Sequence, residues 1–138
     1  SNQSNQTRYE LAQRSLNLIK TYPFGIGAGN WQEIANRYDS THLMAHEYPH
    51  NLIFEIMNEY GVFAGILFLL FILHVSYSAY AKMKNNIHVN SLYPFLFYLW
   101  IFLLLNAMLS GSLDDSRLLF ITSCSILVNS PLTLKKDE

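Results

Sequence analysis

Two long stretches of the chain contain no Asp, Glu, Lys or Arg: one runs from Tyr60 to Ala81 and the other from Asn85 to Leu113. The hydrocarbon core of a bilayer is about 30 Å thick, so a helix needs roughly 20 apolar residues to cross it and about 17 at the least. A third uncharged run, 118–134, is shorter and is interrupted by Asn129 and Pro131. The pattern predicts an all-α, multi-pass membrane protein with about three transmembrane helices, at 50–81, 90–110 and 117–133.

The apolar character of residues 62–73 favours a membrane over a soluble helical core. A surface helix of a soluble protein shows a polar face that recurs every three or four residues. Residues 62–73 contain only apolar side chains and glycine. Contact with lipid on several sides accounts for this composition better than a soluble core does.

The basic residues predict which ends of the spans face the cytoplasm. Lys82 and Lys84 follow the first uncharged run and Lys135 and Lys136 follow the third, whereas the loop 110–117 holds one basic and two acidic residues. Cytoplasmic loops carry an excess of Lys and Arg, so the lysine-bearing ends are expected to be cytoplasmic. Residues 1–48 and the loop 110–117 then form the outer side, and 49–138 form the transmembrane region.

The outer segment, 1–48, predicts an amphipathic helix over residues 8–21. Thr7 and Glu10 have the spacing of a capping box, which marks a helix N-terminus. A stripe of apolar residues then recurs at helical intervals, at Tyr9, Ala12, Leu16 and Ile19. Pro23 and three glycines end the helix, and residues 30–47 predict a loop with a short helix around 31–38.

Pro49 indicates the start of the next helix. Its missing N–H would be unpaired in a first helical turn in any case, so proline is favoured there. That helix is expected to continue through Glu55 and Glu59 into the membrane.

Charge and cysteine content exclude several classes of protein. The formal net charge of −1 leaves no basic footprint for a nucleic-acid partner. Cys124 is the single cysteine and lies in the third predicted span, which excludes an internal disulfide and a cysteine metal cluster. The first six residues do not resemble a signal peptide, and the chain does not begin with Met. We expect it to be the C-terminal part of a longer protein.

The segment His46-Glu47-Tyr48-Pro49-His50 matches the His-Glu-x-x-His pattern of zinc peptidases. That chemistry requires both histidines on one face of a continuous helix. Pro49 would remove a backbone donor there and clash with the carbonyl of Ala45, at a cost of about 3 kcal/mol or more. We therefore expect no metal site and keep an intramembrane zinc peptidase as the less favoured alternative.

The segment Gly25-Ile26-Gly27-Ala28-Gly29 has part of the spacing of a dinucleotide-binding loop. No strand precedes it and no βαβ unit follows, so that function is not favoured. The glycines predict a flexible or tight turn, which also allows the backbone to approach a ligand closely.

His50 is the strongest catalytic candidate, although a lone histidine is more often structural. It stands where a predicted membrane helix begins. Glu55 and Glu59 lie next to the membrane, where a carboxylate is costly unless it faces a polar cavity, so a functional site is the default hypothesis. An imidazole that accepts a proton beside fixed positive charge suits transfer from a phosphate-linked donor.

The order of these features resembles the C-terminal part of the O-antigen ligase and O-antigen polymerase superfamily of bacterial envelope polysaccharide glycosyltransferases. Arg8 is followed by an amphipathic segment that ends at Pro23, and then by the glycine turn that continues into Asn30-Trp31. The most specific part is His50-Asn51 with Gly61 after nine intervening residues and Glu59 two residues before that glycine. Ala64 stands where a small residue is often found, with Gly65 next to it, which is a mild departure.

The resemblance implies an all-helical protein of the bacterial inner membrane, with more spans than this chain has and a large periplasmic loop. Such proteins transfer a glycan from undecaprenyl diphosphate to an acceptor hydroxyl, with inversion and without a required metal or cofactor. The acceptor is the lipid A-core sugar in ligases, a second lipid-linked repeat in polymerases and a protein in some relatives. By itself this fragment is expected to be inactive.

The resemblance also implies residue roles. His50 would be the general base, and Arg8, placed at a helix N-terminus that itself favours anions, would bind the donor diphosphate. Asn51 would hold the imidazole or a sugar hydroxyl, and Glu59 would support the site together with Glu55. The remaining candidates are further substrate contacts suggested by residue type alone. Arg14 and Arg37 could bind phosphate, although each is more typical of a solvated surface. His46 and Tyr48 could line the acceptor side.

A protein of another class fits the same pattern. In a non-catalytic membrane subunit or scaffold, His50 would only cap the helix that follows it. Substitution of His50 would then change stability alone.

Overall fold

The computed structural model describes residues 2–37, 49–86, 91–109, 112–113 and 115–128, and the regular structure in these ranges is helical. The helices, in chain order, are α1 (Asn2–Thr21), α2 (Trp31–Arg37), α3 (Leu52–Tyr60), α4 (Val62–Asn86), α5 (Leu92–Leu109) and α6 (Arg117–Val128). The prediction of an all-α chain is confirmed for the described residues, as is the short helix predicted around 31–38.

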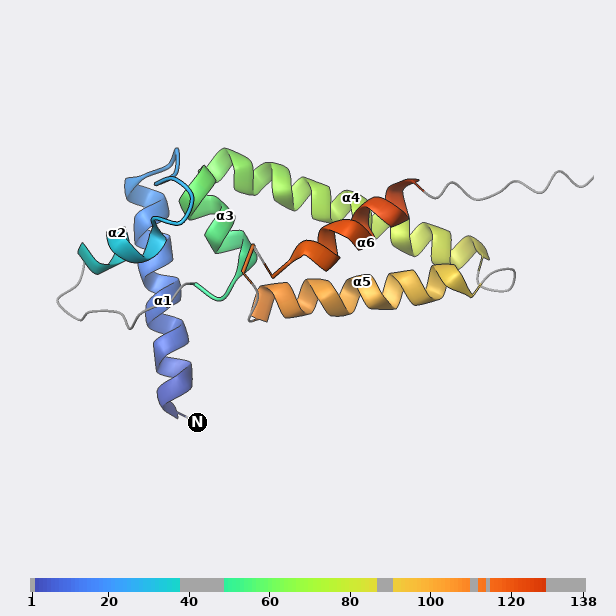
Figure 1. Ribbon diagram of the computed structural model, residues 1–138, viewed down its shortest axis with the longest axis horizontal. Coiled ribbons are helices and arrows are strands. Elements are labelled where there is room, and N and C mark those ends of the chain that lie inside the picture. The colour runs from blue at the N-terminus through green and yellow to red at the C-terminus, as the bar shows by residue number, and fades with distance from the viewer. Residues whose placement is uncertain (1, 38–48, 87–90, 110–111, 114, 129–138) are drawn as a thin grey trace, which may run out of the picture.

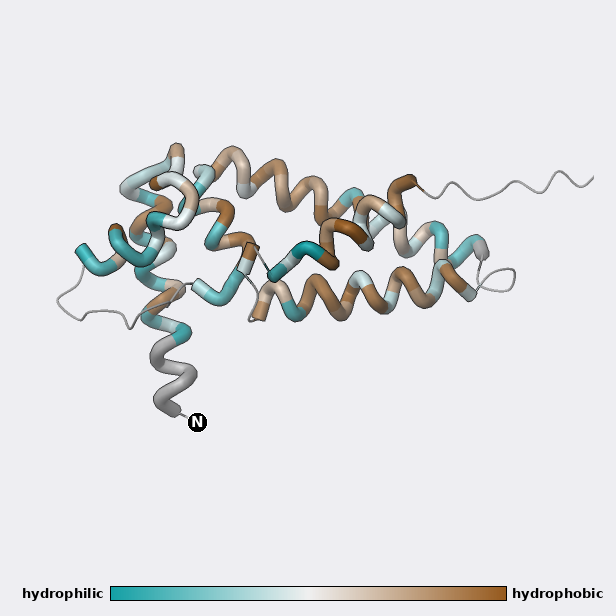
Figure 2. Tube along the Cα trace, viewed as in Figure 1, coloured by the Kyte–Doolittle hydropathy of each residue, from teal (hydrophilic) through white to brown (hydrophobic). Residues whose placement is uncertain are grey.

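The helices form two parts that differ in polarity. α4 and α5 run antiparallel as a long hairpin, and α6 packs against both. α1 runs crosswise at one end of this hairpin, with α2 and α3 beside it (Figure 1). Figure 2 shows that α4, α5 and α6 are mainly hydrophobic, whereas the α1 and α2 end is mainly hydrophilic. A polar layer therefore covers one end of an apolar bundle.

Two of the described helices are long and apolar enough to cross a membrane, at Val62–Asn85 and Leu92–Leu109. Their most apolar windows are only 22% and 11% buried inside the chain, whereas the core helix of a soluble protein is mostly buried. α6 is apolar but has 12 residues, fewer than a span requires. The third predicted span, 117–133, is thus represented by the shorter helix Arg117–Val128, and residues 129–133 lie outside the described residues.

The prediction of one continuous helix over 50–81 is wrong, because the chain breaks at Gly61. Gly61 has a φ of +93°, a conformation that side-chain-bearing residues rarely adopt. A Cβ on Gly61 would lie 2.8 Å from the carbonyl carbon of Phe24 and 2.9 Å from the oxygen of Pro23. The helix before this break, α3, begins at Leu52 rather than at Pro49. Pro49 precedes the helix and is buried.

The predicted amphipathic helix exists, but its start and its buried face differ from the prediction. α1 begins at Asn2, so Thr7 and Glu10 do not form its N-terminal cap and Arg8 does not lie at its N-terminus. The buried positions are Leu11, Arg14, Ser15 and Leu18, spaced three and four residues apart. Leu11 and Leu18 pack on Trp31 and Ala35 of α2. The predicted stripe is turned away from this contact, since Tyr9 is 65% exposed and Leu16 is 45% exposed.

Two close contacts hold the apolar bundle together. Trp100 of α5 is fully buried, and its Nε1 donates a hydrogen bond of 2.8 Å to Oγ of Ser123 in α6. Gly65 of α4 lies against Met57 of α3, and a Cβ on Gly65 would meet the Met57 Cγ at 2.2 Å. The glycine next to Ala64 therefore allows α3 and α4 to approach closely.

Candidate functional site

The glycine turn after α1 is hydrogen-bonded to the junction between α3 and α4. The amide of Ile26 donates to the carbonyl of Asn58 at 2.8 Å, and the amide of Gly27 donates to the carbonyl of Glu59 at 3.0 Å. In the other direction, the amide of Val62 donates to the carbonyl of Pro23 at 2.9 Å. These bonds satisfy carbonyls in the last turn of α3 and an amide in the first turn of α4, which a helix leaves unpaired.

Gly25 makes this docking possible. It has a φ of +89°, and a Cβ at this position would lie 2.5 Å from the oxygen of Glu59 and 2.7 Å from the amide nitrogen of Gly61. Real Cβ atoms do not approach other atoms so closely, so only glycine fits. The close backbone approach that the glycines allow is made to this chain's own α3–α4 junction.

Glu59 holds the far end of the same turn. Its Oε1 accepts a hydrogen bond of 2.9 Å from the amide of Gly29, and its side chain is 9% exposed. An ionised carboxylate buried to this degree is costly unless it is paired or hydrogen-bonded. Glu59 therefore connects the polar segment that precedes α3 to α3 itself.

Asn51 caps α3 and connects it to α5. Its Oδ1 accepts hydrogen bonds from the amides of Ile53, at 3.0 Å, and Phe54, at 3.2 Å. Its Nδ2 donates to the carbonyl of Met108, near the end of α5, at 3.1 Å. Asn is among the residues most favoured as an N-cap because its oxygen satisfies amides of the first turn.

Glu55 makes a second connection from α3, to the turn between α5 and α6. Its Oε2 accepts a hydrogen bond of 2.9 Å from the amide of Leu113. Glu55 and Glu59 are four residues apart and hold two different loops against one short helix. Sequence reasoning singled out both carboxylates from their cost near a membrane, but it could not identify the amides that they bind.

His50 lies immediately before this cap and is half-buried. Its φ is +50°, in the left-handed region, where Asn, Asp and His are the most frequent residues besides glycine. The scaffold hypothesis assigned the capping role to His50, but the capping side chain is that of Asn51. The backbone of His50 thus adjoins a residue that is hydrogen-bonded to both α3 and α5.

The geometry at His50 also bears on the zinc-peptidase pattern. Pro49 and His50 lie outside any helix, and α3 begins at Leu52. The pattern requires His46 and His50 one helical turn apart on a single helix, and His50 does not meet that condition.

The arginines named from the sequence lie in three different environments. Arg8 is exposed on α1, whereas Arg14, expected on the surface, is buried with 8% of its area exposed. Arg37 is exposed and forms an ion pair with Glu33 one turn earlier in α2. His46 and Tyr48 lie outside the described residues.

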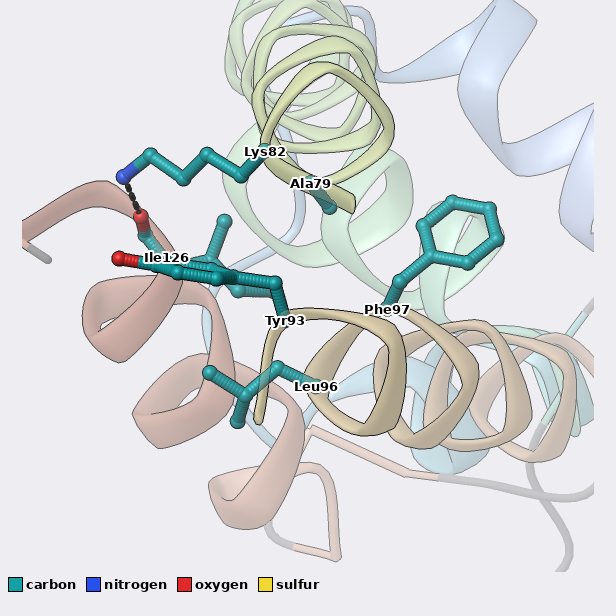
Figure 3. Close-up of a pocket in the computed structure, with 6 residues that line it drawn as sticks. All are labelled: Ala79, Lys82, Tyr93, Leu96, Phe97 and Ile126. Carbon is teal, nitrogen blue, oxygen red and sulfur yellow. Dashed lines mark hydrogen bonds between the residues drawn. The ribbon is translucent and has the colours of Figure 1, made fainter. Parts of the chain in front are cut away.

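A small apolar pocket lies at the other end of the bundle (Figure 3). At 1.5 Å per residue, Ala79 is about 27 Å along α4 from Gly61. Lys82 crosses the pocket mouth and donates a hydrogen bond to the carbonyl of Ile126 near the end of α6. The pocket is lined by Ala79, Lys82, Tyr93, Leu96, Phe97 and Ile126. Its distance and apolar walls separate it from the residues around His50.

The fold and the site together define a helical chain with two membrane-length apolar helices, whose polar segment is hydrogen-bonded over one end of the apolar hairpin. Residues 1–69, which contain the glycine turn, His50-Asn51 and Gly61, match the family model described as O-antigen ligase. The match covers half of the 138 residues, and the chain belongs to the O-antigen ligase family. No curated protein and no solved structure matches the chain.

Membership of this family defines the general activity. The family comprises membrane enzymes that transfer glycans, using a lipid-linked glycan and an acceptor. The matched region ends inside α4, so it contains the polar segment, α3 and the start of the first long apolar helix.

Proposed function

We propose that this chain carries the catalytic end of a glycosyltransferase that moves a glycan from undecaprenyl diphosphate to an acceptor hydroxyl, with His50 as the general base and without a cofactor. The observation that supports this most is the fixed position of His50. It adjoins an N-cap that is hydrogen-bonded to α5, on a helix whose two carboxylates hold two separate loops. A general base must be held within hydrogen-bond reach of the proton that it removes.

In the proposed step, the His50 imidazole accepts the proton of the acceptor hydroxyl while the oxygen bonds to the anomeric carbon of the donor sugar. The bond from that carbon to the diphosphate oxygen breaks, and the electron pair leaves with the diphosphate. Attack opposite the leaving group inverts the anomeric configuration. General base catalysis contributes about 10²–10⁴-fold to such a rate.

Arg8 is proposed to bind the departing diphosphate. α1 packs against α3, and the glycine turn brings the end of α1 to the end of α3. Measured back from this turn at 1.5 Å per residue, Arg8 lies about 20 Å along α1, and the start of α3, which follows His50, lies about 12 Å along α3. The packing of α1 on α3, the exposure of Arg8 and the planar fork of its guanidinium support an anionic ligand between the two helices.

The other named residues fall into two groups under this proposal. Asn51, Glu55 and Glu59 position His50, as their hydrogen bonds suggest. The remaining residues stay candidate substrate contacts, and they are Arg14, Arg37, His46 and Tyr48.

The proposed location is the bacterial inner membrane, with α4 and α5 spanning it and His50 on the periplasmic side. The start of α4 and the end of α5 lie at the end of the hairpin that carries the polar segment, and Lys82 and Lys84 lie at the other end of α4. Basic residues favour the cytoplasmic side. The acceptor is a glycolipid such as lipid A-core, a second lipid-linked glycan or a protein. We expect residues 1–138 alone to be inactive, because the resemblance implies further spans that would complete the donor groove.

Substituting His50 in the full-length protein tests the proposed base. His50→Asn removes the imidazole but keeps a residue type that tolerates the positive φ. Transfer of glycan by membranes is expected to fall about 10²-fold or more, while binding of the lipid-linked donor is retained. A rate within tenfold of that of the unsubstituted protein would contradict the proposed base and favour a scaffold.

Substituting Arg8 tests the diphosphate contact separately. Arg8→Ala is expected to weaken donor binding by about tenfold or more, since charged hydrogen bonds are each worth about 1.5–3 kcal/mol. Lys20→Ala is the matched control, because Lys20 is an exposed cation on the same helix. Equal donor affinity for the two variants would remove Arg8 from the site.

The glycan phenotype of cells that lack the full-length protein distinguishes the two kinds of transfer. Loss of all attached long-chain glycan is expected for a ligase. Attachment of one repeat only is expected for a polymerase.

A further inference from the structure

Phe24 is the most exposed of the large hydrophobic residues in the described α1–α3 region, with 93% of its area accessible. It stands in a turn that is hydrogen-bonded on both sides. The carbonyl of Pro23 accepts from Val62 at 2.9 Å, and Gly25 donates to Tyr22 at 2.9 Å. The aromatic ring of Phe24 is therefore exposed on a turn whose backbone is hydrogen-bonded on both sides.

The position of this ring coincides with the start of the first membrane-length helix. The Cα of Phe24 lies 3.0 Å from the point where a Cβ on Gly61 would stand, so the two residues are in contact. Tyr60 and Phe63, on either side of this junction, are 48% and 74% exposed. Three exposed aromatic residues thus lie where the glycine turn after α1 meets the start of α4.

The exposed surface continues from this cluster along α4. Ile66, Leu67 and Leu70 are 47%, 52% and 57% exposed, and the apolar window of α4 is only 22% buried. If α4 spans the membrane, as the proposed function requires, these residues contact lipid. Aromatic residues are enriched at both membrane–water interfaces, where the hydrocarbon begins.

We infer that Phe24, with Tyr60 and Phe63, forms an aromatic anchor that inserts into the interfacial layer of the outer leaflet. The ligand of this surface is the lipid itself. The anchor rests on the proposed membrane placement of α4, and it extends that placement to a residue of the preceding polar segment.

The anchor sets the depth of the catalytic histidine. α3 joins α4 directly at Gly61, and its N-cap Asn51 is hydrogen-bonded to Met108 near the end of α5. Both ends of α3 therefore lie at the same end of the α4–α5 hairpin. A ring fixed at one end of α3 holds His50, at the other end, at the height of the lipid headgroups, where the diphosphate of a lipid-linked donor lies.

Site-specific labelling of the full-length protein in nanodiscs tests this inference. In a cysteine-free background, with Cys124→Ser in this region, an environment-sensitive fluorophore is attached to Phe24→Cys. Asn17→Cys, an exposed polar position of α1, is the aqueous control, and Leu70→Cys is the control within α4. Lipids with a nitroxide near the headgroup or deep in the acyl chain, and iodide in the buffer, serve as quenchers.

The expected result is quenching of the Phe24 label by the shallow nitroxide at least threefold more than by iodide, with the reverse order for the Asn17 label. Quenching of the Phe24 label mainly by iodide would overturn the anchor. Protection from both quenchers would also overturn it, in favour of coverage by another segment of protein. If the Leu70 label is quenched by the deep nitroxide and the Phe24 label is quenched by neither nitroxide, the anchor fails alone. If the Leu70 label is not quenched by lipid, the proposed membrane placement of α4 fails, and the anchor with it.

Discussion

Gly25 and Gly29 form a matched pair for testing whether the docked glycine turn holds the site together. Both have a positive φ, +89° and +73°, so alanine at either position carries the left-handed strain of about 1–2 kcal/mol. The surroundings differ, because a Cβ on Gly25 would meet Glu59 O at 2.5 Å while a Cβ on Gly29 would have no atom within 4 Å. The difference between the two variants therefore isolates the close contact with α3.

The contact energy follows from the bonds that alanine at Gly25 would break. Moving the turn away from Glu59 removes the hydrogen bonds from Ile26 to Asn58 and from Gly27 to Glu59. Each is worth about 0.5–1.5 kcal/mol net. Gly25→Ala is thus expected to destabilise the docked turn by about 2–5 kcal/mol in all, against about 1–2 kcal/mol for Gly29→Ala.

Hydrogen exchange on the full-length protein in detergent or nanodiscs measures this directly. The amides of Ile26 and Gly27 report the docked state, and each 1.4 kcal/mol of lost local stability raises the exchange rate about tenfold. In Gly25→Ala these two amides are expected to exchange at least several-fold faster than in Gly29→Ala. Equal exchange in the two variants would show that the backbone contact contributes nothing and that the strain alone matters.

Two further predictions concern α3. Asn51→Ala removes the N-cap and the hydrogen bond to Met108, and is expected to lower the free energy of unfolding by about 1.5–3 kcal/mol. Asn51→Asp keeps the capping oxygen and should lose only the smaller contribution, that of the hydrogen bond to Met108. Thermal melts that show equal losses for the two variants would contradict these separate roles. Gly65→Ala is expected to lower the free energy of unfolding by about 1–3 kcal/mol, because its Cβ would meet Met57 Cγ at 2.2 Å. Adding Met57→Ala should recover part of that loss. If the losses of the two single variants simply add in the double variant, the strain lies elsewhere.

The hydrogen bonds around α3 give the short helix a definite mechanical role. Asn51 and Glu55 connect it to the α5 end of the bundle, and Glu59 connects it to the glycine turn after α1. This arrangement accounts for the presence of two carboxylates beside an apolar hairpin, where unpaired carboxylates would be costly.

The sequence by itself determined the helical class, the two membrane-length apolar helices and the residues of the family pattern. These properties are local, because an uncharged run of sufficient length predicts a membrane-length helix by itself. A proline likewise affects only the backbone next to it. His50-Asn51 and Gly61 were recognised because their spacing along the chain is itself the signal. The roles of His50 and Arg8 in transfer stay predictions.

The tertiary structure decided what contacts what. α1 has two possible apolar faces, and helical periodicity cannot show which one a neighbour covers; α2 covers the face of Leu11 and Leu18 and leaves Tyr9 and Leu16 exposed. Gly61 is compatible with a continuing helix, and the structure shows that the helix breaks there, where Gly61 lies against Phe24 and Pro23. Glu55 binds an amide 58 positions further along the chain, at Leu113. Such pairings depend on how helices meet in space, and a local pattern carries no information about them.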